Sequence, residues 1–178
     1  MIDVRNTLLK ILRLELELLS EEMKKELRAQ GHVLTGRLVQ SFEVVTDQNA
    51  FEITAGVKMA FYGEWVNTGI KPINIPFQRG SGKKSSKYID GLIDFFRRRG
   101  LSDKEARRAA FATATIHKRE GYPTKASRRF SSTGRRTGAL NIAIARRTAS
   151  IEGVIDEQLG EAVLAELDTT FSEILNAV

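Results

Sequence analysis

The first thirty residues carry leucine and methionine at the spacing of an amphipathic helix. At about 100° per residue, one set of apolar side chains falls within about 60° of a single direction. Such a stripe has to be buried against another part of the protein, and it is followed by Gly31, a residue type that ends helices. The sequence therefore predicts one long helix over residues 2–30. Its stripe consists of Leu8, Leu9, Leu12, Leu16, Leu19, Met23 and Leu27.

The same helix carries a second apolar set, more than about 100° away from the first, which is formed by Ile11, Leu14 and Leu18. A helix that is apolar on two faces has to bury both of them. Another segment of the chain or a neighbouring subunit can cover the second face, and the sequence leaves both alternatives open. These three residues are therefore candidates for a subunit or partner interface.

The rest of the chain predicts an α+β fold with several helices. Residues 42–46 and 51–57 are rich in β-branched and aromatic residues and predict an antiparallel β hairpin. Thr35 is the expected N-cap of a short helix, and Ser102 with Glu105 forms a capping box that opens a helix to about residue 120. Further helices are expected at 59–66, 86–99 and about 156–177, the last after an apolar segment from residue 139, with long basic loops at 70–86 and 121–138. The expected core stripe of the last helix consists of Leu159, Val163, Leu167, Phe171 and Ile174.

The net charge of +6 conceals three segments of unlike charge. Residues 1–70 hold 8 basic and 10 acidic side chains, residues 71–147 hold 20 and 5, and residues 148–178 hold 0 and 7. The net charges of the three segments are therefore −2, +15 and −7. Such asymmetry indicates a partner of negative charge, or charge pairing between segments or subunits.

A chain of 178 residues can bury a core without disulfides or a structural metal. The absence of cysteine excludes a disulfide scaffold, thiolate catalysis and Cys-ligated zinc or iron–sulfur clusters. The longest uncharged stretches are about half of the roughly 20 residues that cross a bilayer, and the N-terminus lacks the pattern of a secretory signal. We therefore expect no membrane partner and a setting in a cytoplasm, or in a particle assembled there.

The sequence contains no recognisable catalytic constellation. Gly80-Ser81-Gly82-Lys83 resembles part of a phosphate-binding loop, but Phe77 stands where the first glycine belongs and Lys84 where the magnesium-binding hydroxyl belongs. The two histidines, His32 and His117, have no second histidine or carboxylate at metal-ligand spacing. No serine or threonine has a recognisable base partner. We therefore expect no enzyme activity, no metal and no cofactor.

Arginine and lysine occur in doublets and triplets through the basic middle of the chain, from 97–99 to 146–147. Such side chains neutralise phosphates without reading the base sequence. A nucleic-acid-binding protein that uses residues 79–147 is one interpretation, and pairing of these residues with the acidic C-terminal segment is the other. The candidate contacts to DNA or to an acidic partner are Arg79, Lys83, Lys84, Arg128, Arg129, Arg135 and Arg136.

Several short motifs follow one another in a characteristic order. Thr35-Gly36-Arg37-Leu38 with Ser41-Phe42 precedes the predicted hairpin, and Tyr62-Gly63-Glu64-Trp65-Val66-Asn67-Thr68-Gly69 follows it. This order resembles the tail-completion and head-tail joining proteins of tailed bacteriophages. That family shows TGRLxxS, then strands, then YAxxxExG, a proline-containing stretch and a C-terminal helix. The resemblance covers roughly residues 1–76 and, loosely, the last helix.

The resemblance implies a non-enzymatic virion protein, a head-tail connector or tail completion protein that forms a homo-oligomeric ring through which DNA passes without being read. Its partners would be copies of itself and other neck and tail proteins, assembled in the host cytoplasm. The chain departs from the family pattern by a basic insertion at about 81–137 in a single domain of residues 1–178. Tyr62 and Trp65 are further candidate interface residues, since interfaces are rich in aromatic side chains, although a core position for Trp65 is the alternative.

Overall fold

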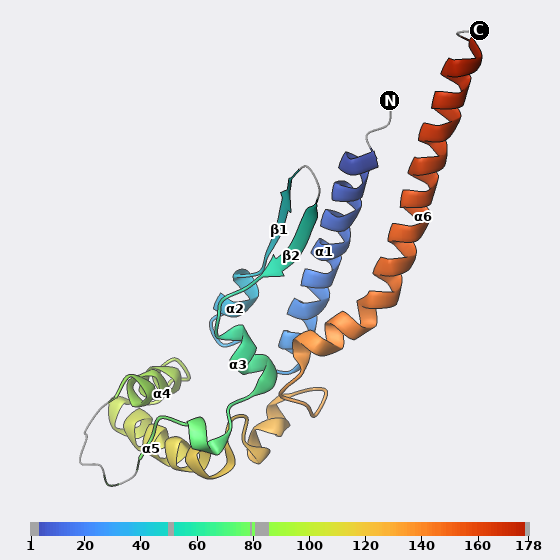
Figure 1. The fold of residues 1–178 in the computed structure, drawn as a ribbon. Helices are drawn as coiled ribbons and strands as arrows, with labels where there is room; N and C mark the ends of the chain where they lie inside the picture. The colour runs from blue at the N-terminus through green and yellow to red at the C-terminus, as the bar shows by residue number, and fades with distance from the viewer. Residues whose placement is uncertain (1–3, 50–51, 79, 81–85, 177–178) are drawn as a thin grey trace. The chain divides into compact units, whose positions relative to one another are not determined.

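The structure is a computed structural model that describes residues 4–49, 52–78, 80 and 86–176, with side chains as far as residue 172. Helices dominate it, and it contains a two-stranded antiparallel sheet (Figure 1). This confirms the predicted α+β class with its long N-terminal helix, its hairpin and its C-terminal helix. Arg79, Lys83 and Lys84 lie outside the described residues.

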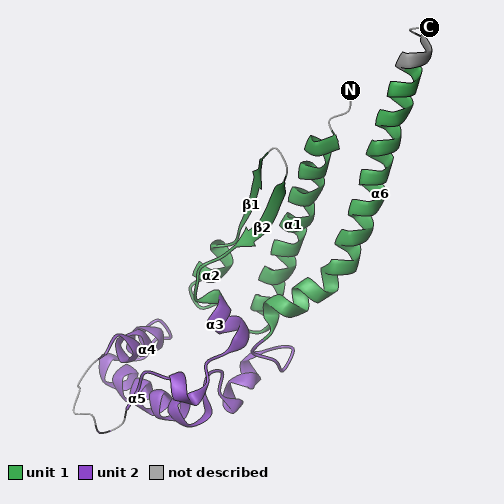
Figure 2. Ribbon diagram, viewed as in Figure 1, with its two compact units in different colours: residues 1–63, 138–178 green, residues 64–137 purple. Residues whose placement is uncertain are grey.

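The chain divides into two compact units, shown in Figure 2. Unit 1 combines Met1–Gly63 with Gly138–Val178, and unit 2 is Glu64–Thr137. Unit 2 therefore includes the segment 81–137, for which the sequence predicts a basic insertion. The organisation as a single domain stays a prediction.

Unit 1 begins with helix α1 (Val4–Ala29), as the leucine stripe predicts. Leu19, Met23 and Leu27 of that stripe are 8%, 6% and 1% exposed. Gly31 then adopts φ 73°, a left-handed conformation that glycine reaches at little cost after a helix. One face of α1 therefore forms part of the core of unit 1.

A β hairpin packs on α1. Its strands β1 (Glu43–Gln48) and β2 (Ile53–Lys58) pair antiparallel, with Glu43 opposite Lys58 and Gln48 opposite Ile53. Helix α6 (Ala139–Asn176) also packs on α1 and lies on a different side of it from the hairpin (Figure 1). The core of unit 1 therefore centres on α1.

The short helix α2 (Arg37–Gln40) connects α1 to the hairpin and buries Leu38 and Val39. Its N-cap is Gly36 at φ 70°, so the prediction of Thr35 as the cap was wrong by one residue. The Thr35 Oγ1 atom accepts a long bond of 3.4 Å from the Arg37 backbone N–H. The left-handed conformation of Gly36 turns the chain into α2, and no side chain caps this helix.

Helix α6 is continuous over 38 residues, whereas the sequence predicts a helix only from about residue 156. One face of its first turns is buried, with Ala139 and Ala143 fully covered. Gly153 and Gly160 each cost about 0.5–1 kcal/mol in a helix interior. Packing along α1 offsets that cost, since most helical stability in proteins comes from tertiary contacts.

Two arginines of α6 pair with carboxylates of α1 that are almost completely buried. Arg147 donates to Glu15, which is 4% exposed. Arg146 donates to Glu26, which is 3% exposed, and to Glu22, both at 3.0 Å. These two arginines are the C-terminal end of the basic segment 79–147, so charge pairing within the chain accounts for them.

Unit 2 is built around two helices, α4 (Lys87–Arg97) and α5 (Asp103–Glu120). Ser86 caps α4 by accepting a bond of 3.2 Å from the Ile89 N–H. The predicted capping box of α5 is confirmed, since Glu105 accepts from the Ser102 N–H at 3.1 Å. The fully buried alanines of α5 leave room for close packing of the neighbouring helix. They are Ala106, Ala110 and Ala114.

The remaining helices of unit 2 are short. They are α3 (Gly63–Thr68), which starts four residues later than predicted, and the 3₁₀ turns η1 (Pro72–Asn74) and η2 (Lys125–Phe130). The predicted loop 121–138 is therefore partly structured. Segment 70–78 runs beside α5, where Phe77 meets Phe111 edge to face at 6.3 Å and Lys118 Nζ donates to the Ile75 carbonyl at 3.2 Å.

A backbone pairing joins two distant segments of unit 2. The Ile70 N–H donates to the Tyr122 carbonyl at 2.7 Å, and the Tyr122 N–H donates to the Ile70 carbonyl at 2.8 Å. Gly69 and Gly121, at φ 77° and 83°, precede these two residues. A Cβ atom on Gly69 would lie 2.6 Å from the Tyr122 carbonyl oxygen, and one on Gly121 would lie 2.6 Å from that of Ile70. The pairing thus requires glycine on both segments.

Replacing Arg147 by leucine leaves the Glu15 carboxylate buried without its cation. We expect Arg147→Leu to lower the free energy of unfolding by about 3 kcal/mol or more, measured by urea unfolding followed by circular dichroism. The double variant Glu15→Leu/Arg147→Leu should recover most of the loss, because it removes both buried charges.

The matched control is Arg13→Leu, which breaks the exposed Arg13–Glu17 pair, whose side chains are 69% and 54% exposed. Exposed pairs contribute at most about 1 kcal/mol. If both variants lowered the free energy of unfolding by the same amount, burial of the Glu15–Arg147 pair would not add to its contribution to stability.

Candidate partner-binding surfaces

The outer face of α1 presents two large apolar side chains at a spacing of four residues. Leu14 is 55% and Leu18 is 44% exposed, as the predicted interface requires. Ile11 is only 5% exposed, so it belongs to the core of unit 1, and its assignment to the interface is corrected. The 100° separation between the two predicted faces did not place Ile11 outside the buried surface, because the hairpin and α6 both pack on α1.

The two aromatic candidates belong to different units, and each is described within its own. Tyr62, in unit 1, is partly buried and meets the ring of Phe61 edge to face at 6.0 Å. Phe61 itself is 74% exposed. Trp65, in α3 of unit 2, is 50% exposed, so a large part of its ring is available to a partner.

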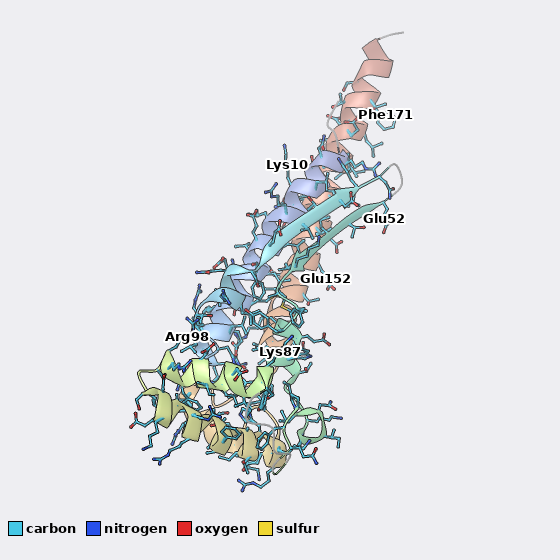
Figure 3. The ribbon with its side chains drawn as sticks, turned by 90° about the vertical axis from the view of Figure 1, so that its left-hand side faces the viewer. Lys10, Glu52, Lys87, Arg98, Glu152 and Phe171 are labelled. Atoms are coloured by element: carbon cyan, nitrogen blue, oxygen red, sulfur yellow. The ribbon has the colours of Figure 1, made fainter. Side chains whose placement is uncertain are left out.

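The described arginines of the second basic loop lie on η2 and in the turn after it. Arg128, Arg129 and Arg135 are exposed, whereas Arg136 is partly buried. At the C-terminal end of α4, Arg98 is also exposed (Figure 3). The next residue, Arg99, is exposed as well. Among the described residues, no carboxylate forms an ion pair with Arg98, Arg99, Arg108, Arg128, Arg129 or Arg135.

Phe130 joins these basic elements, and the sequence analysis did not select it as a site residue. The Arg129 guanidinium lies 4.8 Å and that of Arg99 5.5 Å from the centre of the Phe130 ring. Arg99 also lies 4.6 Å from the ring of Phe95. Phe130 remains 49% exposed. Phe130 is therefore an exposed aromatic ring with two guanidinium groups close to it. The sequence signal that could have indicated this site is Arg-Arg-Phe at 128–130. We call Arg99, Arg129 and Phe130 the arginine–phenylalanine surface.

The division into units also divides the charge. Unit 2 holds 18 basic and 6 acidic side chains, a net charge of +12, and unit 1 holds 10 and 16, a net charge of −6. The two values add to the total of +6. The surfaces of the two units therefore differ in the kind of partner that they favour.

His117 is a buried link between α4 and α5. The Tyr88 hydroxyl lies 2.6 Å from its Nδ1 atom, and the Tyr122 ring meets it edge to face at 5.5 Å. Burial lowers the pKa of His117, and the nearby Glu120 carboxylate opposes this effect. Burial also raises the pKa of Tyr88 to about 12, so the hydroxyl stays protonated. It donates to Nδ1 or accepts from it according to the tautomer of the neutral imidazole.

The described part of the chain contains no group of three or more His, Asp or Glu side chains arranged to hold a metal ion. No described helix combines the length and the apolar composition needed to cross a bilayer. Comparison with protein-family models, with curated proteins and with solved structures finds no match. The surfaces described above are therefore the basis for proposing a function.

Because the pKa of His117 is lower in the folded protein than the ordinary value near 6.5, the unfolded chain takes up a proton first as the pH falls. The stability of unit 2 is therefore complete above about pH 6.5 and decreases below it. We expect thermal unfolding of α4 and α5 to occur at a lower temperature at pH 5.5 than at pH 7.5.

The effect is measured as the difference between the protein and its His117→Gln variant, because a glutamine amide can donate or accept a hydrogen bond but does not titrate. Other titrating groups contribute equally to both proteins. An identical pH dependence of the melting temperature in the two proteins would contradict the assignment to His117.

Proposed function

We propose that this chain is a non-enzymatic structural protein of a tailed-phage virion, which forms a homo-oligomeric ring at the head-tail interface or at the top of the tail. The observation that carries the proposal is the exposed apolar face of α1 at Leu14 and Leu18. Two half-exposed leucines one helical turn apart are typical of a surface that a neighbouring subunit covers. The order of the sequence motifs supports the same role.

The motif residues have structural roles that fit a shared scaffold. Gly36 provides the left-handed turn before α2, Leu38 is 5% exposed, and the Ser41 hydroxyl accepts from the Ala60 N–H at 2.9 Å. Gly69 allows the close approach of the Tyr122 carbonyl. These motif residues therefore stabilise the fold. Leu14 and Leu18 have no such role, because their side chains are exposed, and they are available for assembly.

A ring built from one kind of subunit uses two different patches on each copy, and such heterologous contacts close by rotation. The outer face of α1 provides one patch. In such a ring the exposed arginines of unit 2 provide a non-specific contact to DNA or to an acidic neighbouring protein.

The test deletes the gene from a phage or prophage that encodes it. We expect heads filled with DNA and tails that are not joined to them, as seen by electron microscopy, and rescue by the wild-type chain in trans. Leu14→Glu/Leu18→Glu should fail to rescue, with infectivity reduced at least 100-fold, because two charges would face the covering subunit.

Lys10→Glu/Lys25→Glu, which alters two exposed charged residues of the same helix, is the matched control. An antibody to the chain should label the neck or the top of the tail. Joined, infectious particles that lack the chain would refute the proposed function.

A second candidate, a nucleic-acid-binding protein that acts through residues 79–147, is favoured by one observation. Six exposed arginines of unit 2 have no carboxylate partner among the described residues. Such a protein would bind duplex DNA as an isolated chain, and its affinity would fall with salt by a slope of about 0.9 per phosphate contact.

For this candidate, Arg128→Gln/Arg129→Gln/Arg135→Gln should reduce the slope of log K against log salt by about 2 to 3. Lys10→Gln/Lys25→Gln on α1 should leave it unchanged. Fluorescence anisotropy with duplexes of two unrelated sequences measures both effects. Absence of binding at 50 mM salt would eliminate this candidate.

A further inference from the structure

The C-terminal part of α6 carries an apolar stripe that the rest of unit 1 leaves exposed. Helix α6 has 38 residues and α1 has 26, and the pairs Glu15–Arg147 and Glu22–Arg146 align the two helices antiparallel. At 1.5 Å per residue, α6 is about 18 Å longer. Figures 1 and 3 show that α6, with Phe171, continues past the N-terminal end of α1.

This extension presents Leu164, Leu167 and Phe171, which are 67%, 48% and 62% exposed. The prediction that Leu167 and Phe171 belong to a core stripe was therefore wrong, because α6 extends beyond α1 at these positions. Their spacing of three and then four residues places them on one line along the helix. Gly153 and Gly160 lie on the same line, and a Cβ atom at either position would meet nothing within 4 Å. The outer face of α6 is therefore open over several turns. We call Leu164, Leu167 and Phe171 the α6 stripe.

The charge beside the stripe restricts its occupant. Residues 148–178 hold seven acidic side chains and no basic one. Glu157, Glu161 and Asp168 are exposed and lie within about 60° of the α6 stripe on a helical wheel. A second α6 placed against the stripe would bring like charges together, which disfavours symmetric pairing. The occupant must therefore combine an apolar surface with positive charge.

Unit 2 of this same protein has that combination. Its net charge is +12, and its arginine–phenylalanine surface consists of a half-exposed ring between two guanidinium groups, neither of which forms an ion pair with a described carboxylate. The ring of Phe130 suits the apolar stripe, and Arg99 and Arg129 suit the carboxylates beside it. Electrostatic complementarity of this kind sets both specificity and association rate.

Distance along the chain favours a second copy over the same one. Unit 2 has 74 residues, so its radius of gyration is about 11 Å and its width about 30 Å. It joins α6 at Gly138, and the α6 stripe lies about 40 to 50 Å further along the helix. Unit 2 of a second molecule can reach the α6 stripe, because it is not tied to Gly138 of the first molecule.

We propose that the α6 stripe of one copy binds the arginine–phenylalanine surface of unit 2 in a second copy. The contact joins two different patches, so it is heterologous and can repeat around a ring. It rests on the proposed function, since it names a pair of surfaces by which the ring would close. It adds to the role of Leu14 and Leu18 and does not involve them.

The absence of cysteine allows a test by site-directed cross-linking of the full chain. One preparation carries Leu167→Cys and another carries Ala126→Cys, on η2 beside the arginine–phenylalanine surface. A short bismaleimide joins two thiols by forming one thioether bond at each, with loss of the two thiol protons. We expect the mixture to give at least tenfold more cross-linked dimer than either preparation alone.

The matched control replaces Ala126→Cys by Lys58→Cys, an exposed position on β2, and should give only background cross-linking. A chain that carries both Leu167→Cys and Ala126→Cys should give dimers and higher oligomers. If it gives only an internally cross-linked monomer, the contact lies within one copy and the proposal is wrong. Helical content by circular dichroism identifies any variant that does not fold.

Charge reversal tests the chemistry of the contact. Glu157→Lys/Glu161→Lys/Asp168→Lys in the first preparation should lower the yield of dimer at least fivefold, and Arg99→Glu/Arg129→Glu in the second should do the same. Combining both reversals should restore the yield. If neither reversal changes it, the proposal fails. It also fails if Arg99→Glu/Arg129→Glu abolishes DNA binding but leaves the yield of dimer unchanged.

The same variants separate this proposal from the proposed function. If the acidic triple variant loses the cross-link but still rescues the gene deletion, the contact is not needed for assembly, and the connector role stands. If the cross-link forms but particles join without the chain, the contact stands and the virion role fails.

Discussion

The buried pair of Glu15 with Arg147 sets the alignment of α6 on α1, and most of unit 1 depends on that alignment. Apolar contacts are not directional, so a leucine stripe tolerates a shift of one helical turn. A buried carboxylate does not, because the shift would leave two charges without partners. Arg146, which bridges Glu22 and Glu26, adds a second constraint on the same two helices. The exposed C-terminal part of α6 follows directly from this alignment and from the unequal lengths of the helices.

The sequence predicted elements whose cause is local. The leucine stripe indicated α1, the Ser102–Glu105 box indicated the start of α5, and the β-rich segments indicated the hairpin. It did not predict that α6 is continuous from Ala139, because the partner that stabilises its first turns lies more than 100 residues earlier. The sequence also did not predict that the second basic loop is partly structured, because this structure depends on the pairing of Tyr122 with Ile70, a residue far away in the sequence.

For the candidate surfaces, too, the sequence predicted what has a local cause and missed what depends on distant contacts. Periodicity was enough to place Leu14 and Leu18 outside the main stripe, but it could not show that neighbouring elements cover Ile11. Counting charges found the basic middle, but only the fold shows that Arg146 and Arg147 pair with α1 while Arg99 and Arg129 border an exposed ring. A net charge of +6 is therefore the sum of an acidic and a basic unit, each with its own surface chemistry.

The backbone pairing of Ile70 with Tyr122 has a consequence for how such a chain can evolve. It ties the two ends of an internal segment together, so residues between them form a loop that is already closed at its base. The entropic cost of lengthening a closed loop rises only slowly with the number of residues. Residues 71–121 can therefore be lengthened, shortened or exchanged at small cost to the α1–α6 scaffold. New binding properties can then arise in unit 2 while the framework of α1 and α6 keeps its shape.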